Sequence, residues 1–478
     1  MPGLTMNCDS ACIPIEKPLR KRLLNRVRLE SSVVPPMPAP YLYMPMEIAS
    51  RELDSRLLIA LFAVQAGLEV VIGQKWLLQK NARAMPKGYW IFKTLTPGDA
   101  KQMQRIQKLG HAIAAIDEEM PGLGDGSQRL RWVDPRSVNA TEAIFCLGRQ
   151  HVAAMERSYP DHAHKLITTG NPRWDFLRPE LRGIYAADAA AITRDYGRFL
   201  LVNTNIGLVN SAKNSPEGLI RALTGDGRIN LDLPEDRAFV TDLQAFERAN
   251  FAAAAPLVRR LSEAFPDRQI VLRPHPTEKL EPYQTALAGV PRAHIVREGP
   301  AAAWLSAADL LIHTSCTTAT EAFALGKPAI CYQTIPSPLH SYFLSSALSA
   351  IARSEDEVIA ETQRILAAGS DDPAAVAERQ VRFEDYFAGQ SGPFAAELIA
   401  RFVADATGAV ALRPHKSTWK PGLLFRKKWR PTAFQRNIFP DFSADDIARR
   451  LGELAAQIGV SEPLHVRRCG DGQFHIST

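Results

Sequence analysis

The chain alternates short apolar runs with amphipathic segments, and this alternation constrains the fold more than any other feature. Apolar runs of strand length in the first half occupy residues 41–46, 68–72, 91–95, 111–116, 143–147 and 165–168. Between them, segments 51–66 and 97–109 carry apolar residues at helical spacing, and a glycine follows each. Strands that alternate with helices in this way predict βαβ units and a parallel sheet.

The same rhythm starts again after a seam near residues 180–197. The strands predicted for the second half are 199–203, 269–272, 294–296, 309–313 and 329–332, with helices at about 243–264, at 302–307 and from Thr317. Two such halves predict an α/β fold of two Rossmann-like domains, residues 39–185 and 195–406. We expect them to face each other across a cleft, because open α/β sheets bind ligands at the carboxyl ends of their strands. Helices within 374–406 are expected to pack back across the seam.

The two ends of the chain have a different character. Residues 1–38 form a basic, irregular segment that ends in a Pro-rich linker. Residues 410–478 are predicted to be a C-terminal appendage with a basic run at 426–430 and a helix at 443–458. A chain of 478 residues is too long for one hydrophobic core and suits two domains with such extensions.

Composition narrows the class of protein. Hydrophobic residues make up 46% and charged residues 23%, as in soluble globular proteins. The net charge of +6 favours anionic partners such as nucleotides or an acidic membrane surface, and it is too small for a nucleic-acid-binding footprint. The alternative is that this charge serves only solubility. No apolar stretch reaches the length of a membrane span and no signal peptide is evident, so we expect a cytoplasmic protein that can touch the inner membrane peripherally.

Polar residues follow two apolar runs of the second half at the point where each run ends. Because the carboxyl ends of parallel strands share one edge of a sheet, these residues are candidates for one ligand site. Asn203 and Asn205, after the first strand of this half, are further candidates. The remaining predicted nucleotide contacts are Arg273, His275, Pro276, Thr314, Ser315, Thr317, Thr318 and Glu321.

The residue types in this set suit a nucleotide. Arg273 and His275 suit a phosphate by charge and hydrogen bonding, and the prolines on both sides of His275 make its backbone rigid. The hydroxyl groups before the next helix, with the free N–H groups of its first turn, suit an anion. Glu321 can accept hydrogen bonds from a ribose diol. The alternative is that Ser315 or Thr317 only caps the helix.

Three successive carboxylates, Asp117, Glu118 and Glu119, follow the strand at 111–116. In a closed cleft they would repel one another, so one of them should have a raised pKa and serve as a general acid or base. Opposite a sugar nucleotide, such a carboxylate could deprotonate an acceptor hydroxyl or attack the anomeric carbon. The alternative is a solvated acidic turn without a catalytic role.

The acid triplet, the His-Pro strand end and the Ser/Thr-rich helix start resemble three motifs of bacterial GT-B sialyltransferases and Kdo transferases, which use CMP-activated ulosonic acids. Segments 47–54, 169–175 and 273–276 look like those of surface-carbohydrate biosynthesis proteins akin to the capsule Kdo transferases. The resemblance covers roughly residues 40–400 and implies a GT-B-like fold. Short His-Pro motifs also occur in CDP-glycerol transferases and UDP-sugar epimerases of this fold.

The resemblance implies roles for individual residues. Glu118 or Glu119 would be the acid/base carboxylate, and His275 would bind or protonate the departing CMP phosphate, which Ser315 and Thr317 would also hold. The chain departs from the pattern after the acidic residues, where Met120 and Pro121 precede Gly122. Which of the three carboxylates is catalytic therefore stays open.

Three residues of the first half are candidates for contact with the acceptor or the sugar. Glu47 and Arg51 follow the first strand, and the alternative for them is a charged helix start. Arg173 lies in a turn after the last strand of this half and could pair with a carboxylate on the sugar, although a structural turn is an equal alternative. The chain contains no Asp-x-Asp pair, so we expect a reaction without metal or other cofactor.

These features together predict a glycosyltransferase of surface polysaccharide biosynthesis, for capsule or lipopolysaccharide. It would transfer Kdo or a related ulosonic acid from a CMP-activated donor to a glycan or glycolipid acceptor, and the basic run at 426–430 could dock on anionic lipid. The alternatives are a UDP-sugar 2-epimerase, a CDP-glycerol-type transferase and a scaffold without activity.

Overall fold

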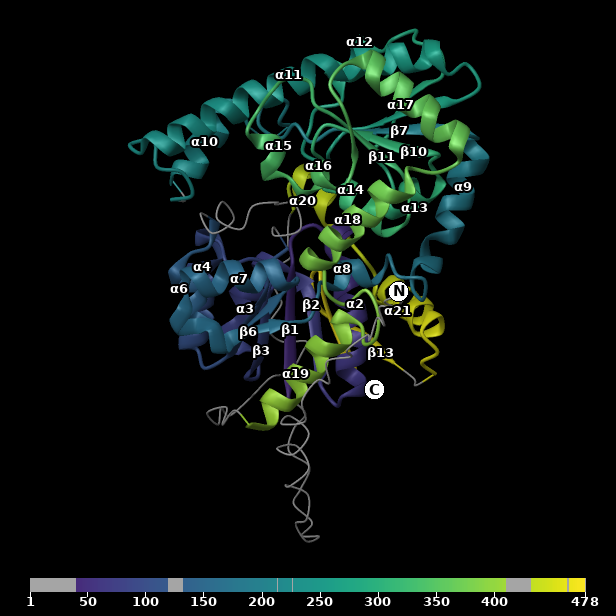
Figure 1. Ribbon diagram of the computed structural model, residues 1–478. Coiled ribbons are helices and arrows are strands. Elements are labelled where there is room, and N and C mark those ends of the chain that lie inside the picture. The colour runs from purple at the N-terminus through teal and green to yellow at the C-terminus, as the bar shows by residue number, and fades with distance from the viewer. Residues whose placement is uncertain are drawn as a thin grey trace, which may run out of the picture. The chain divides into compact units, whose positions relative to one another are not determined.

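A computed structural model describes residues 40–118, 132–212, 214–225, 227–409, 431–461 and 464–477. The strands of this part of the chain form two sheets (Figure 1). Helices connect the strands within each half. Those of the first half are α2 (Ala49–Gln65), α3 (Lys75–Asn81), α4 (Pro97–Lys108), α6 (Pro135–Ala140), α7 (Arg149–Ser158) and α8 (Pro172–Asp175).

The first sheet has the strand order β13-β14-β2-β1-β3-β4-β5-β6. Its six N-terminal strands are parallel and close to the predicted positions. Only β3 differs by several residues, because it begins at Gly88 and ends before Lys93. Gly88 is required there, since a Cβ atom would collide with the backbone of Tyr41. The strands are β1 (Tyr41–Met46), β2 (Glu69–Gln74), β3 (Gly88–Phe92), β4 (Ala112–Ile116), β5 (Ala143–Cys146) and β6 (Leu166–Thr168).

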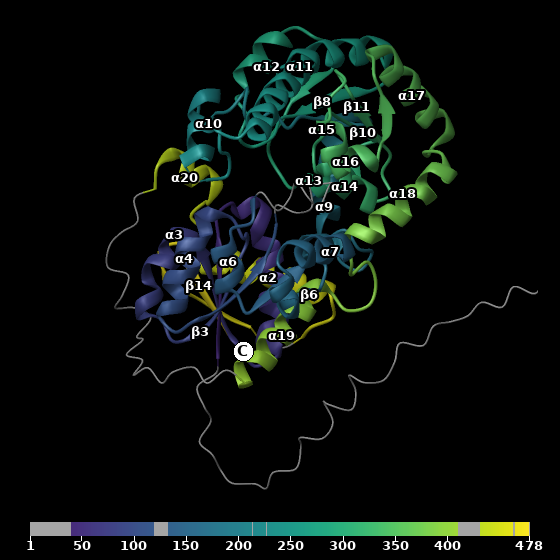
Figure 2. The same ribbon diagram turned by 60° about the vertical axis from the view of Figure 1, so that its left-hand side comes forward.

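The second sheet is wholly parallel and has the order β12-β11-β10-β7-β8-β9. Figure 2 shows β8, β10 and β11 together within it. The predicted α/β class with two Rossmann-like halves is therefore confirmed. Its strands are β7 (Phe199–Asn203), β8 (Gln269–Arg273), β9 (Ala293–Ile295), β10 (Leu310–His313), β11 (Ala329–Tyr332) and β12 (Ala350–Ala352).

The helices of the second half lie between these strands. The longest, α11, begins at Pro234, about ten residues before the predicted start, because Pro234 at its first position with Glu235 and Asp236 in its first turn favours a helix start there. The set is α9 (Ala186–Tyr196), α10 (Pro216–Gly225), α11 (Pro234–Ala264), α12 (Glu281–Ala286), α13 (Ala301–Ala307), α14 (Thr318–Ala324), α15 (Leu339–Tyr342), α16 (Leu344–Ala347) and α17 (Glu355–Ala368).

The order of strands reverses once in each sheet. In the first sheet β2 lies on one side of β1, and β3 to β6 follow on the other side. In the second sheet β8 and β9 lie on one side of β7, and β10 to β12 lie on the other. Loops diverge at such switch points and leave a crevice at the carboxyl ends of the strands. The topology thus points to the ends of β1 and β3, and of β7 and β10.

The chain returns to the first half after α18 (Pro373–Tyr386), as predicted. Its next helix, α19 (Ala395–Ala409), places Ile399 and Val403 in the same core as α2. The end of α18 and the loop that follows it pass against the ends of β5 and β6, where a Cβ atom on Gly148 or Gly170 would collide with the carbonyl of Tyr386 or Ala388. Helix α19 follows the second half in the sequence but packs in the core of the first half, so it ties the two halves together.

The C-terminal segment is joined to the first sheet and is not separate from it. Strand β14 (Gln473–Ser477) pairs antiparallel with β2, and β13 (His465–Gly470) pairs with β14. The hairpin lies there because Phe474 and Ile476 are buried in the core of the first half. Helices α20 (Ala433–Ile438) and α21 (Ala444–Gln457) precede it. The predicted basic run at 426–430 lies outside the described residues.

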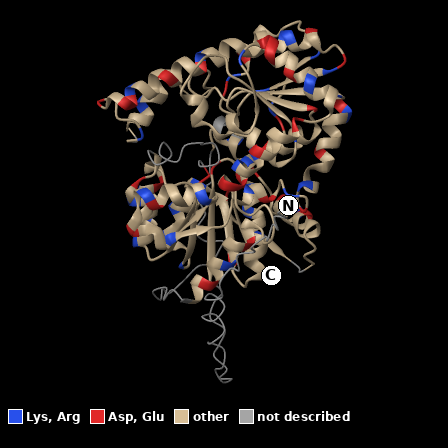
Figure 3. Ribbon diagram, viewed as in Figure 1, with Lys and Arg blue, Asp and Glu red and all other residues tan. Residues whose placement is uncertain are grey.

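In the view of Figure 3, acidic and basic residues are interspersed along the described helices. Among the described residues, no helix combines the length and the apolar character needed to cross a bilayer.

Candidate functional site

Three adjacent strands of the second sheet end in polar residues. Asn203 and Arg273 were predicted as contacts, and His313 was not. The register aligns Asn203 of β7 with Arg273 of β8 on one side and with His313 of β10 on the other. Their backbones are therefore side by side at the carboxyl edge, at the point where the strand order reverses. The tertiary structure brings together segments that are some 40 to 110 residues apart in the sequence.

Ser315 adopts a backbone conformation that L-residues rarely occupy, with φ of 141°. Its N–H donates to Nδ1 of buried His313 at 3.1 Å, and the other ring nitrogen of His313 donates to Ser349 Oγ at 2.9 Å. Burial lowers the pKa of His313 to about 3, so the ring is neutral and Nδ1 is available as an acceptor. Strained backbone held by such over-determined contacts concentrates at functional sites.

The hydroxyl groups beside Ser315 form a small polar cluster. Asn203 Nδ2 donates to Thr318 Oγ1 at 2.9 Å. Asn203 Oδ1 and Thr314 Oγ1 are buried, and neither has a hydrogen-bond partner within the described part of the chain. Thr317 stands at the helix start but makes no side-chain cap bond, so the capping alternative does not account for it. Two buried polar atoms are thus left for a ligand or water to satisfy.

Glu278 organises the loop that follows β8, and no sequence motif singled it out. It is completely buried and accepts hydrogen bonds from the N–H groups of His275 and Ile206, both at 3.0 Å. It also accepts from Thr204 Oγ1 at 2.8 Å and from the Tyr283 hydroxyl at 2.6 Å. Glu278 therefore ties the loop after β8 to the loop after β7. In the sequence, only the position of Glu278 three residues after His275 could have pointed to this role.

His275 is a neutral hydrogen-bond donor in this arrangement. Its Nδ1 accepts from the Thr277 N–H at 3.3 Å and lies 2.8 Å from Thr277 Oγ1, so its proton is on Nε2. Burial, with the nearby charges of Arg51, Arg273 and Arg297, lowers the pKa of His275 to about 3. A positively charged His275 that would pair with a phosphate is therefore disfavoured.

The three arginines that act on His275 come from different parts of the fold. Arg51 lies in α2 and makes no ion pair or side-chain hydrogen bond within the residues that the structure describes. Arg273 donates to the Gly299 carbonyl at 2.6 Å, and Arg297 donates to the carbonyl of Glu278. The Nε atoms of Arg273 and Arg297 are buried, and no described group accepts from them. Such a convergence of guanidinium groups on a neutral imidazole suits an anion.

Glu118 lies at the end of β4 and pairs with a buried arginine. Its Oε1 is 2.7 Å from Arg56 Nη2, and both side chains are buried. Burial alone would raise the pKa of Glu118, but Arg56, Arg173 and Lys93 outweigh it and the pKa is lowered. The prediction of a raised pKa is therefore wrong for Glu118, because the charges of Arg56, Arg173 and Lys93 act on it. Asp117 is also buried, and Glu119 lies outside the described residues.

Glu47 and its neighbours form an ion-pair network at the ends of β1 and β3. Lys93 lies 2.8 Å from Glu47 and 3.5 Å from Glu52. Glu52 also accepts from the N–H groups of Glu47 and Ile48, at 3.1 and 3.0 Å. Both carboxylates are thus held near the start of α2, where the helix dipole favours them. Lys93 belongs to this edge, although sequence analysis did not name it.

The turn at 169–175 is structural at most of its positions. Asn171 caps α8, and Asp175 accepts from the N–H groups of Ala395 and Ala396, at 3.0 and 2.9 Å, which caps α19. Arg173 is the exception, because its Nη2 lies 2.9 Å from Glu321 Oε1 in α14. Two residues predicted to contact different parts of a ligand therefore contact each other.

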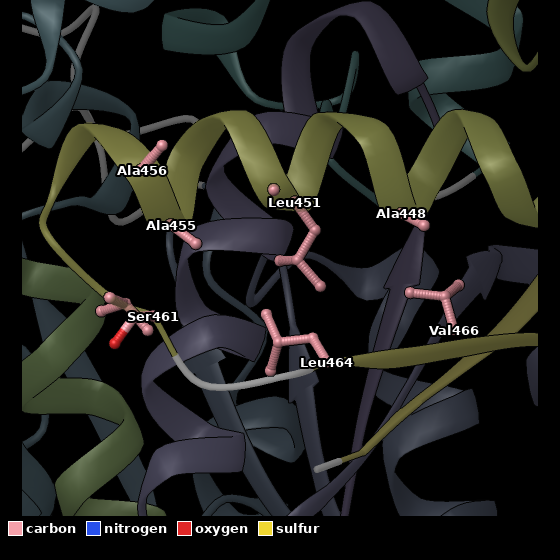
Figure 4. Close-up of a pocket in the computed structure, with 9 residues that line it drawn as sticks. Ala448, Leu451, Ala455, Ala456, Ser461, Leu464 and Val466 are labelled. Atoms are coloured by element: carbon pink, nitrogen blue, oxygen red, sulfur yellow. The ribbon is translucent and has the colours of Figure 1, made fainter.

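One cavity lies at the carboxyl edge of the second sheet, and another lies beside β13, away from this edge. The first, of about 460 Å³, includes the predicted contacts Asn205 and Pro276 in its lining and lies beside Arg297. The other, of about 250 Å³, lies under α21 (Figure 4). There Leu451 faces Leu464 and Val466 across a space lined mostly by small and aliphatic side chains, and Ser461 supplies its one side-chain hydroxyl among the residues described.

Comparisons with known proteins concern the fold. No protein-family model and no curated protein matches the sequence. Among solved structures, the chain is similar to the UDP complex of MnaA from S. aureus, with 11% identity, a TM-score of 0.43 and coverage of 79% of this chain and 98% of that one. It is also similar to UDP-GlcNAc 2-epimerase from Neisseria meningitidis bound to UDP-GlcNAc, with 12% identity, a TM-score of 0.45 and coverage of 78% and 100%.

A third similar structure is the wall teichoic acid polymerase TagF, with 10% identity, a TM-score of 0.45 and coverage of 78% of this chain and 90% of that one. Identities this low, with TM-scores below 0.5, bear on the fold alone. The assignment of the site rests on the residues described above.

Proposed function

We propose that the chain is an enzyme that binds a nucleotide-activated sugar and transfers the sugar to an acceptor. One observation carries the proposal: Asn203 Oδ1 and Thr314 Oγ1 are buried without partners among the described residues, beside strained Ser315 at the switch point of the second sheet. Leaving buried polar atoms unsatisfied costs free energy, about 1–3 kcal/mol each. A ligand that hydrogen-bonds there recovers that energy.

The charges around this point suit the phosphate of the nucleotide. The Nε2–H of His275 would donate to a phosphate oxygen, while Arg51, Arg273 and Arg297 supply positive charge. Because His275 is neutral, its role in this proposal is to donate a hydrogen bond and not to add charge. Glu321 would accept from the ribose once Arg173 releases it.

Glu118 would act on the sugar side of the same site. The acceptor hydroxyl would lose its proton to this carboxylate as its oxygen bonds to the anomeric carbon. The bond from that carbon to the phosphate oxygen would break, and its electron pair would leave with the nucleotide. Arg56 would keep Glu118 ionised and oriented until the proton is transferred. An ionised carboxylate also stabilises the positive charge that develops at the anomeric carbon.

The donor that we propose is a CMP-linked ulosonic acid such as CMP-Kdo, on the resemblance of the acidic, His-Pro and Ser/Thr motifs to the sialyl and Kdo transferases. The proposed setting is cytoplasmic synthesis of a surface polysaccharide. A UDP-sugar 2-epimerase shares the fold and also places carboxylates opposite a nucleotide, so it is the outcome against which the proposal is tested.

Thermal unfolding with CMP, CDP and UDP tests the donor. A nucleotide that binds the folded state at a hundred times its Kd stabilises it by about 2.7 kcal/mol. We expect CMP to raise Tm more than CDP or UDP, and Asn203→Leu to abolish the effect. Stabilisation by UDP alone, with conversion of UDP-GlcNAc to its 2-epimer, would show that the chain is an epimerase and not a transferase. No response to any nucleotide would refute both.

A further inference from the structure

The 460 Å³ cavity is enclosed by the segment that connects β7 to α11, which includes α10. Its walls are mostly aliphatic. Six of the apolar residues that line it are Leu208, Leu219, Leu223, Ile229, Val240 and Leu243. No aromatic ring occurs among its described lining residues, so the cavity offers no surface on which a nucleobase would stack.

Helix α10 directs its apolar face at this cavity and not at a core. Leu219, Ile220 and Leu223 line the cavity, while Arg221 and Ala222 on the same helix are exposed. No residue of α10 is buried. An amphipathic helix normally buries its apolar stripe against other side chains. Here that stripe faces a space large enough for an apolar ligand.

The cavity is continuous with the anion site of the proposed function. Thr277 and Arg297 belong to its lining, and they also contact or act on His275. The buried Nε of Arg297 has no acceptor among the described residues. One end of the cavity is therefore cationic, and the rest of its wall combines aliphatic residues with the polar residues Asn205, Ser211 and Asn214 and the acidic Glu247.

Glu247 is the acidic residue in the lining, and its carboxylate already has partners. Its Oε2 accepts from the N–H groups of Leu208 and Val209, at 2.7 and 2.9 Å. It therefore holds the wall of the cavity. Burial raises the pKa of Glu247 to about 7, so its charge is partly neutralised near physiological pH.

Two exposed leucines follow a cavity-lining residue in the sequence. Leu231 and Leu233 follow the lining residue Ile229 by a few positions, and they are 37% and 42% exposed.

We propose that this cavity binds the hydrocarbon chain of an anionic lipid whose phosphate lies at Arg297. The aliphatic wall provides apolar burial for the chain, and Arg297 provides the charge for the head group. The proposal rests on the proposed function in one respect, since it makes this lipid the anchor of the acceptor. Lipid binding itself can be measured without any transfer reaction.

Dodecyl phosphate, below its critical micelle concentration, is the probe for calorimetric titration of the full chain. Dodecanol and inorganic phosphate separate the contributions of chain and head group. We expect saturable binding of dodecyl phosphate and at least tenfold weaker binding of inorganic phosphate. Leu223→Trp, which fills the cavity, should weaken dodecyl phosphate binding at least tenfold.

Ala222→Trp is the matched control, because it adds the same ring to the exposed face of α10. It should leave the affinity for dodecyl phosphate unchanged. Arg297→Gln should weaken binding of dodecyl phosphate about tenfold and leave binding of dodecanol unchanged. Equal affinities in the two tryptophan variants would overturn the proposal.

A failure of lipid binding is distinguishable from a failure of the proposed function. If dodecyl phosphate does not bind while CMP still raises Tm, the lipid site is refuted and the nucleotide site stands. If lipid binds as expected while no nucleotide does, the lipid site stands and the sugar-nucleotide function is refuted. Far-UV circular dichroism of each variant confirms that it is folded.

Discussion

Arg173 Nη2 lies 2.9 Å from Glu321 Oε1, and this ion pair joins the turn after β6 to helix α14 of the second half. The two side chains are only 17% and 11% exposed. Each residue had been expected to contact a ligand. In the structure each residue instead neutralises the charge of the other. Replacing either residue would leave the charge of its partner largely buried and unpaired.

The pair should therefore stabilise the fold. We expect Arg173→Ala and Glu321→Ala each to lower the free energy of unfolding by about 1–3 kcal/mol, as for loss of one partner of a partly buried pair. The double variant should lose less than the sum, with a coupling of about 1 kcal/mol measured by urea unfolding. The exposed pair of Arg449 and Glu453 on α21 is the control, with a coupling of about 0.5 kcal/mol or less. Additive losses at Arg173 and Glu321 would contradict this expectation.

Glu118 should be essential for turnover if it acts on the sugar. Replacing it by Gln removes the charge and keeps the shape, and we expect turnover to fall by roughly 10²–10⁴-fold. Because Arg56 keeps the pKa of Glu118 below its usual range, the acid limb of the rate profile should lie below pH 4.5 in the parent chain.

Arg56→Met should move that acid limb to higher pH. Loss of the cation leaves burial unopposed, so the pKa rises and the ionised fraction falls at any given acidic pH. Arg56→Lys restores the charge and should restore most of the profile. Rates measured from pH 4 to pH 8 give the shift. An unchanged acid limb in Arg56→Met would show that Glu118 is not the titrating group.

His313 should make stability depend on pH. Its pKa is about 3 in the fold and about 6.5 when unfolded, so the unfolded chain binds more protons below pH 6.5. Stability is therefore lost as pH falls from 6.5 towards 3. His313→Asn keeps an acceptor for the Ser315 N–H and removes the titration. Between pH 7.5 and 5.0 the parent should lose roughly 2 kcal/mol relative to this variant. Equal pH dependence in the two chains, measured by chemical unfolding, would exclude His313 as a buried neutral base.

Replacing Ser315 by glycine should preserve the stability of the fold and weaken nucleotide binding. At φ of 141° glycine is unstrained, so Ser315→Gly should be no less stable than the parent and about 1 kcal/mol more stable than Ser315→Ala. Both variants lack the hydroxyl and should bind the nucleotide about tenfold more weakly, as expected for the loss of about one hydrogen bond. Full affinity in Ser315→Gly would remove the Ser315 hydroxyl from the site.

Local patterns predicted the elements of the fold well. Apolar runs located the strands from β1 to β11, since a strand buried on both faces must be nearly all apolar, but the short strand β12 was missed. The strand predicted at 91–95 begins three residues earlier, at Gly88, in the structure. Glycine is needed there by the neighbouring backbone of Tyr41, which no local pattern encodes. The C-terminal hairpin was missed because its partner, β2, is some 400 residues earlier in the chain.

The sequence by itself determined the two α/β halves, their seam, and the strand ends that carry polar side chains. The spacing of apolar residues and the positions of glycine and proline, on which these predictions depend, are local properties of the chain. Only the tertiary structure decided that Arg173 meets Glu321, that Arg56 holds Glu118 ionised, and that Glu278 ties two loops together. These are pairings of charges and buried polar groups across segments distant in the chain. Their energies depend on distance and burial, which exist only once the sheets have packed.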